Sequence, residues 1–235
     1  MNFPPSLTKK NLNVPVIIIL LTVIVFLIQN LSKLLIGVDL PLALGAKINM
    51  FIMRGELWRL VTPVLLHGSV LHIGFNMYAL YSVGPILEKK YGKRAFIALY
   101  LISAIWGNVF SFILTENPSL GASTAIFGLI AAQGVYIYKN QLFLGSAARP
   151  LLMNIAMVIL VNLMLGLSPG IDNWGHLGGL FGGFIFAWFA GPSYELHQND
   201  LGQNVVVNNA RKPYLILAAA VVLAFGIVMI RIFTQ

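Results

Sequence analysis

The 235-residue sequence contains no cysteine, and only 9% of its residues are charged. The absence of cysteine excludes thiol catalysis, disulfide bonds and thiolate metal sites. The scarcity of charge excludes an ordinary soluble domain, in which about 25% of the residues are charged. Apolar residues take the place of charged ones, since 58% of the sequence is hydrophobic and its mean hydropathy is +0.85.

This composition predicts an integral membrane protein. A hydrocarbon core about 30 Å thick is crossed by a helix of roughly 20 apolar residues, and the sequence has room for several such helices. We expect an all-α bundle whose helices lie at residues 14–36, 60–83, 94–114, 122–139, 150–168, 174–190 and 213–233.

The predicted helices divide the chain into four parts. These are a cytoplasmic N-terminal segment (1–13), a six-helix core (14–190), a polar cytoplasmic linker (191–212) and a peripheral seventh helix (213–235). The first apolar run is interpreted as a membrane helix, because it is long and ends in Gln29 and Asn30 without the small-residue cleavage site of a signal peptide. The amphipathic stretch 37–59 is expected at the membrane interface.

The net charge of +8 comes from short basic clusters between the apolar segments. Short loops rich in Lys and Arg stay on the cytoplasmic side of a membrane, and most of the 15 basic residues lie at alternate ends of the predicted helices. This pattern predicts a cytoplasmic N-terminus in a plasma membrane, which in a bacterium is the inner membrane. Anionic lipid headgroups explain the basic clusters better than nucleic acid does.

A few polar side chains lie in or beside the apolar segments, namely His67, His72, Asn76, Ser123 and His176. Polar residues are costly inside a membrane and usually face the interior of a bundle, which makes them functional candidates. By the predicted topology, all of them lie near the outer ends of their helices. We therefore expect one polar cluster that admits water from the outer face.

Ser123 and His176 are the candidates for a nucleophile and its base. Ser123 follows a glycine turn at Gly121, and glycine recurs at every fourth position from 175 to 183, beside His176. Small-residue surfaces of this kind let helices approach closely. A serine hydroxyl becomes an effective nucleophile when a base lies within about 2.6–3.2 Å, and the close approach would bring His176 within that reach.

The remaining polar residues can stabilise charge. His72 and Asn76 are four residues apart and share a helix face, so they can donate hydrogen bonds to a tetrahedral oxyanion together with the N–H of Ser123; each such donor is worth about 10²- to 10³-fold in rate. No carboxylate lies within the segments, since Asp172 is a loop residue, so a hydrolase built here would use a dyad. The five-residue spacing of His67 and His72 argues against zinc, and we expect no metal or cofactor.

At this point the sequence resembles the rhomboid family of intramembrane serine proteases. The stretch "GASTAIFG" resembles its nucleophile motif, "GHLGGLFGG" its histidine-glycine helix, "HGSVLHIGFN" its His and Asn element, and "GELWRLVTPVLLH" the Trp-Arg end of its first loop. All four occur in family order, and the resemblance covers residues 14–190, with the last helix similar to the six-plus-one arrangement of part of the family.

The resemblance implies a role for each candidate. Its catalytic residues are Ser123 and His176, with an oxyanion hole formed by His72, Asn76 and the N–H of Ser123. Its supporting residues are His67, structural or water-retaining, Phe127, stacked beneath His176, and Gly121. The partners it implies are transmembrane protein substrates, cut in or near their membrane segment, and membrane lipids.

Other interpretations stay open at the level of sequence. Ser123 alone is typical of a helix N-cap, His176 of a satisfied buried histidine, and His72 with Asn76 of interhelical hydrogen bonding. A catalytically inactive rhomboid-like protein that binds membrane helices is the first alternative function. A small transporter is the second, since glycine-interrupted helices and polar groups in the membrane are transport features.

Overall fold

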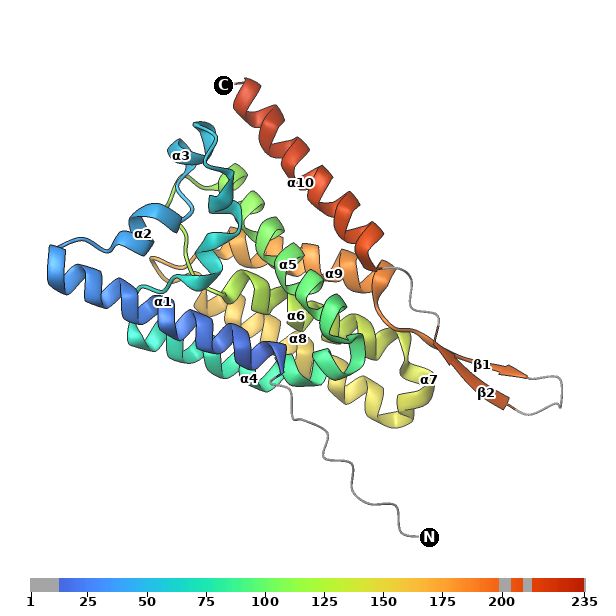
Figure 1. Ribbon diagram of the computed structural model, residues 1–235. Coiled ribbons are helices and arrows are strands. Elements are labelled where there is room, and N and C mark those ends of the chain that lie inside the picture. The colour runs from blue at the N-terminus through green and yellow to red at the C-terminus, as the bar shows by residue number, and fades with distance from the viewer. Residues whose placement is uncertain (1–12, 199–203, 209–212, 235) are drawn as a thin grey trace, which may run out of the picture.

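The computed structural model describes residues 13–198, 204–208 and 213–234 (Figure 1). Its long helices are α1 (Val14–Ile36), α4 (Val70–Tyr91), α5 (Lys93–Leu114), α6 (Ser123–Lys139), α8 (Ala148–Leu165), α9 (Asn173–Ala190) and α10 (Pro213–Thr234). Short helices connect them: α2 (Leu40–Gly45), α3 (Asn49–Met53), α7 (Gln141–Leu144) and the 3₁₀ turns η1 (Leu57–Leu60), η2 (Thr62–Leu65) and η3 (Gly145–Ala147). The predicted helical membrane bundle is confirmed.

One small sheet was not predicted. Strands β1 (Tyr194–Gln198) and β2 (Asn204–Asn208) pair antiparallel within the segment that was expected to be a polar linker, with Tyr194 opposite Asn208 and Gln198 opposite Asn204. The hairpin projects from the end of the bundle, between α9 and α10 (Figure 1). It adds a small β element to the otherwise helical structure of the described residues.

The second helix begins later than the sequence predicted. The apolar residues from 60 onward form the 3₁₀ turns η1 and η2, after which Leu66 is extended. Helix α4 starts only at Val70, because the Ser69 hydroxyl caps it by accepting a hydrogen bond from the N–H of His72 at 3.2 Å. The helix then continues to Tyr91, well past the predicted end, with Pro85 inside it.

Five of the described helical segments are long and apolar enough to cross a membrane: α1, α4, α5, α10 and the continuous stretch of α7 and α8. Helices α6 and α9, with 17 and 18 residues, are not among them. Both are rich in small residues and largely buried, so neighbouring helices rather than lipid surround much of their surface. The six-plus-one count therefore stays a prediction.

Helix α5 is the centre of the bundle, and both α6 and α9 pack against it (Figure 1). Glycines let α6 and α9 touch backbone to backbone: a Cβ atom on Gly179 would overlap the carbonyl of Thr124, and one on Gly183 would overlap that of Gly128. Helix α10 packs on α5 and α9, and its buried face repeats every fourth residue at Ala220, Ala224 and Val228.

The contact between α6 and α9 yields a test of stability. Replacement of Gly179 by Ala should destabilise the bundle by about 1–3 kcal/mol, the usual cost of overpacking, because the new methyl group meets backbone atoms that cannot rotate away. The measurement is thermal unfolding in detergent.

Gly74→Ala is the matched control, since Gly74 lies in the exposed part of α4 with nothing within 4 Å of a Cβ atom. This substitution lowers the conformational entropy of the unfolded chain. It should therefore stabilise the protein by about 0.4–1 kcal/mol. Equal effects of the two substitutions would contradict the tight helix contact.

Candidate active site

Ser123 is the first residue of α6, and a turn at Gly121 leads into it. Gly121 has φ +121°, a conformation that side chains other than glycine rarely adopt, and its N–H donates to the carbonyl of Pro63 at 2.9 Å. The N-cap position belongs to Ala122, so Ser123 does not cap the helix. Its hydroxyl is instead directed at another helix.

His176 lies in the first turn of α9, and its Nε2 is 3.0 Å from the Oγ of Ser123. The start of α9 is fixed by Asp172, whose carboxylate accepts from the N–H of Gly175 at 2.9 Å and whose carbonyl accepts from the N–H of His176. Phe127 of α6 stacks on the imidazole, with ring centroids 4.3 Å apart and planes 13° apart. The two rings are stacked in the structure, and a supporting role for Phe127 stays a prediction.

The direction of the hydrogen bond between Ser123 and His176 depends on which imidazole nitrogen carries the proton. For the hydroxyl to donate, Nε2 must be the unprotonated nitrogen, and the proton then sits on Nδ1. Among the described residues, Nδ1 of His176 has no hydrogen-bond partner. Asp172 uses its carboxylate Oδ1 on the helix cap, and its Oδ2 also has no hydrogen-bond partner among the described residues.

His72 and Asn76 lie on the face of α4 that meets the turn at Gly121. A Cβ atom on Gly121 would lie 2.7 Å from the Nε2 of His72 and 3.7 Å from the Nδ2 of Asn76. The Asn76 amide donates one hydrogen bond to the carbonyl of His72 at 3.1 Å. Two side-chain donors thus border the residue that precedes Ala122 and Ser123.

His67 lies outside the helix, in the segment before α4, and it supports the turn rather than facing the hydroxyl of Ser123. Its ring is edge-on to that of His72, with centroids 4.9 Å apart, and its Nε2 accepts from the N–H of Ala122 at 3.5 Å. Burial, and secondarily the neighbouring His72, lowers the pKa of His67 to about 4. The ring is therefore neutral near pH 7 and can accept this hydrogen bond.

Gln29 of α1 is a site residue that the sequence did not reveal. Its side-chain amide forms two hydrogen bonds with the backbone of His67. Oε1 accepts from the N–H at 3.1 Å, and Nε2 donates to the carbonyl at 3.3 Å. The same Nε2 donates to Asp39 at 3.0 Å. A buried glutamine in an apolar helix was the available signal, because such a group needs partners inside the bundle.

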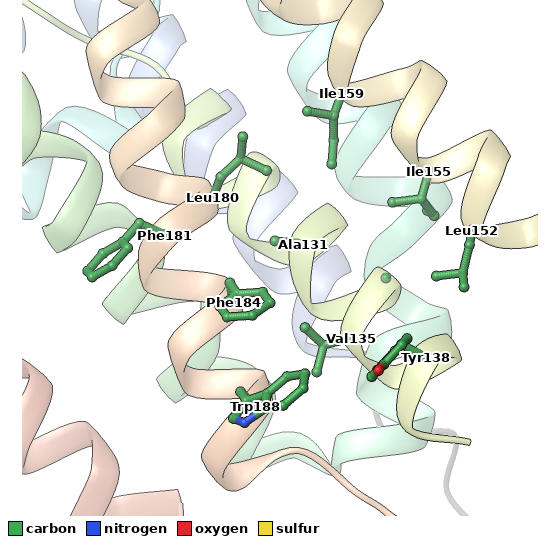
Figure 2. Close-up of a pocket in the computed structure, with 11 residues that line it drawn as sticks. Ala131, Val135, Tyr138, Leu152, Ile155, Ile159, Leu180, Phe181, Phe184 and Trp188 are labelled. Atoms are coloured by element: carbon green, nitrogen blue, oxygen red, sulfur yellow. The ribbon is translucent and has the colours of Figure 1, made fainter. Parts of the chain in front are cut away.

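The cavity shown in Figure 2 is separate from this cluster. It is a groove of about 480 Å³ between α6, α8 and α9, and its lining includes Ile155, Leu180 and Phe184. None of the lining residues is a His, Ser or carboxylate. A groove lined in this way could accommodate apolar chains but offers no reactive side chain. The candidate residues for catalysis are therefore those of the polar cluster.

Within the described part of the chain, no group of three or more His, Asp or Glu residues is arranged to hold a metal ion. The polar cluster is instead built from one hydroxyl, one stacked imidazole and several hydrogen-bond donors. That combination matches the needs of acyl transfer, in which a base activates an alcohol beside donors for an oxyanion.

Comparison with known proteins identifies the family of this chain. The rhomboid domain family matches residues 54–193, which is more than half of the chain and contains the whole cluster except Gln29 and Asp39. This chain belongs to the rhomboid family. The match also covers the Trp-Arg element, where the Arg59 guanidinium donates to the carbonyls of Ala43 and Ala46 and so ties this rhomboid's first loop together.

Three relatives give the range of similarity. The chain is 40% identical over 171 residues to rhomboid protease GluP of Bacillus subtilis, a match that covers 72% of this chain and 33% of GluP. It is 38% identical over 160 residues to rhomboid-like protease 1 of Toxoplasma gondii, covering 66% and 53%. It is 33% identical over 146 residues to putative rhomboid protease YdcA of B. subtilis, covering 60% and 70%. The aligned part thus spans only about a third of GluP and about half of the Toxoplasma protein.

Gly121 offers a test of the site's geometry. Gly121→Ala should lower the reactivity of Ser123 by about 10²-fold or more, the loss typical of an active site displaced by about 1 Å, because the new methyl group meets the Nε2 of His72 and the φ of +121° disfavours a side chain. The measurement is the rate of labelling of Ser123 by a fluorophosphonate.

Gly68→Ala is the matched control, since a Cβ atom there would make only an ordinary contact with Leu120 at 3.9 Å. Its labelling rate should equal that of the wild type. Full reactivity of Gly121→Ala would show that the turn and His72 are not in contact.

Proposed function

We propose that this rhomboid is an intramembrane serine endopeptidase that uses Ser123 and His176 as a catalytic dyad. The observation that carries the proposal is the 3.0 Å separation of Ser123 Oγ and His176 Nε2, within the range for proton transfer from a nucleophile to its base. The stacked ring of Phe127 supports it, because stacking holds the imidazole plane in the direction of the hydroxyl.

Acylation follows from this geometry. The Oγ of Ser123 attacks the scissile carbonyl carbon while His176 takes the hydroxyl proton. The carbonyl oxygen becomes an oxyanion, and the N–H of Ser123 with the side chains of His72 and Asn76 donates hydrogen bonds to it. When the intermediate collapses, the carbon–nitrogen bond breaks and His176 passes its proton to the leaving amine.

Deacylation repeats these steps with water in place of the serine. His176 takes a proton from the water molecule, whose oxygen attacks the acyl carbon, and then returns a proton to the Oγ of Ser123. The site must therefore admit water although it lies among membrane helices. We place it near the outer face, where the polar cluster at the helix ends can be hydrated.

The substrates are membrane proteins, cut in or beside a transmembrane segment. The amides of a substrate helix are locked in hydrogen bonds, so the helix must unwind locally before Ser123 can attack. Small or helix-destabilising residues near the cleavage point would lower the cost of that unwinding.

An activated serine can be detected directly. The purified wild type should be labelled by a fluorophosphonate and should cleave a single-pass substrate, whereas Ser123→Ala and His176→Ala should do neither. Ser123→Ala should melt at the wild-type temperature, because it removes only one small hydroxyl group. If folded wild type is neither labelled nor able to cleave, the proposed protease function is wrong, and the inactive helix-binding alternative is the one to test next.

The proposed role of His176 predicts a pH dependence. A protonated imidazole cannot accept the serine proton, so kcat/KM should fall as the pH drops through the pKa of this histidine, for which the ordinary value is about 6.5. Cleavage rates measured between pH 4 and 8 should follow one titrating group, with the melting temperature recorded at each pH to separate unfolding from protonation. A rate that rises as the pH falls over this range, with the protein still folded, would exclude His176 as the base.

A further inference from the structure

Helix α10 carries one charged residue in its last turn, Arg231, and this residue contacts the loop that follows α5. Its guanidinium donates to the carbonyl of Phe112 and to the carboxylate of Glu116, the latter at 2.9 Å. It also lies over the ring of Phe112, 4.8 Å from the centroid. An arginine in an apolar helix is costly unless it is paired, and here it is paired with the C-terminal end of α5 and the residue Glu116 that follows it.

The opposite side of the same loop is held by Asn49 of α3. Its Nδ2 lies within 3.1 Å of the carbonyls of Phe112 and Thr115 and 2.8 Å from Oε2 of Glu116. The two carboxylate oxygens of Glu116 are thus divided between Arg231 and Asn49. The loop is fixed between the first loop of the protein and its seventh long helix.

Lys47 continues this support toward the nucleophile. Its Nζ donates to the carbonyls of Thr115 and Asn117, both at 3.0 Å, and its backbone exchanges two hydrogen bonds with Ser119, also at 3.0 Å. Burial lowers the pKa of Lys47 to about 8. Ser119 is two residues before the turn at Gly121, so the supported segment runs directly into Ser123.

We infer that Arg231 is a positioning residue, through which α10 holds the loop at residues 115–121 and thereby the turn that presents Ser123. Packing alone does not explain it, because α10 already buries Ala220, Ala224 and Val228 in the bundle without any charged group. The effect on activity rests on the proposed protease function. The effect on the loop itself does not.

The experiment compares Arg231→Ala and Arg231→Lys with the wild type. Arg94→Ala is the matched control, since Arg94 is an exposed arginine at the start of α5, at the opposite end of that helix from Phe112. Two quantities are measured: the rate of fluorophosphonate labelling of Ser123, and the hydrogen exchange of backbone amides at residues 115–122. Thermal unfolding is recorded for every variant.

Arg231→Ala should lower the labelling rate about 10-fold, because the nucleophile would be modestly misplaced. It should also speed amide exchange at residues 115–122, while amides in the middle of α6 and α9 keep their protection. Arg231→Lys, which retains the charge and can still donate to Phe112, should recover part of both. Arg94→Ala should change neither. Unchanged exchange and labelling in Arg231→Ala would overturn the inference.

Two further outcomes are separable. If Arg231→Ala does not fold, Glu116→Gln replaces it, because this substitution alters an exposed side chain that pairs with Arg231; it should speed loop exchange, and an unchanged loop would overturn the inference. If the wild type is not labelled at all, the protease function fails, and the exchange of residues 115–122 alone then decides the role of Arg231.

Discussion

The close approach of α6 and α9 is the constraint on which the rest of the structure depends. Where Gly179 and Gly183 meet the backbone of α6, no side chain separates the two helices, and the first turns of both helices therefore lie within one hydrogen bond of each other. The 3.0 Å contact of Ser123 with His176 is a consequence of that packing. Lipid tails supply little hydrophobic force between helices, so the fit of small residues has to provide this precision.

The loops around the site are held in place by side chains that form hydrogen bonds with their backbone groups. Gln29 holds both backbone polar groups of His67, Arg59 holds carbonyls of the first loop, and Lys47 and Asn49 hold carbonyls after α5. Irregular backbone near a membrane needs internal partners for its N–H and C=O groups. Long polar side chains that reach several carbonyls meet that need, and they also fix the turn at Gly121.

The features that could be predicted from the sequence are those that depend on a local residue pattern. Helix α1 was placed at its observed bounds because it begins with a long apolar run. Ser123 and His176 were singled out because each lies in a glycine-rich motif, and their catalytic role stays a proposal. The start of α4 was misplaced, since the apolar residues around Pro63 look helical until the Ser69 cap is seen. Gln29 and Arg231 were not recognised as functional, because their roles depend on partners 38 and 115 to 119 residues away. Such pairings are properties of tertiary packing, and the local sequence shows only a polar residue in an apolar helix without indicating its partner.

The site is assembled from three helix N-termini, and this explains why a polar reaction can be placed in an apolar protein. The first N–H groups of a helix lack intrahelical partners and carry partial positive charge. In α4 the side chain of Ser69 accepts a hydrogen bond from one of these N–H groups, and in α9 the side chain of Asp172 does the same. Helix α6 has no side-chain cap. An oxyanion at Ser123 would therefore meet the N-terminus that keeps its donors. Under the proposed protease function the missing cap would be a functional feature, because a serine or aspartate at Ala122 would compete with the oxyanion for the same N–H groups.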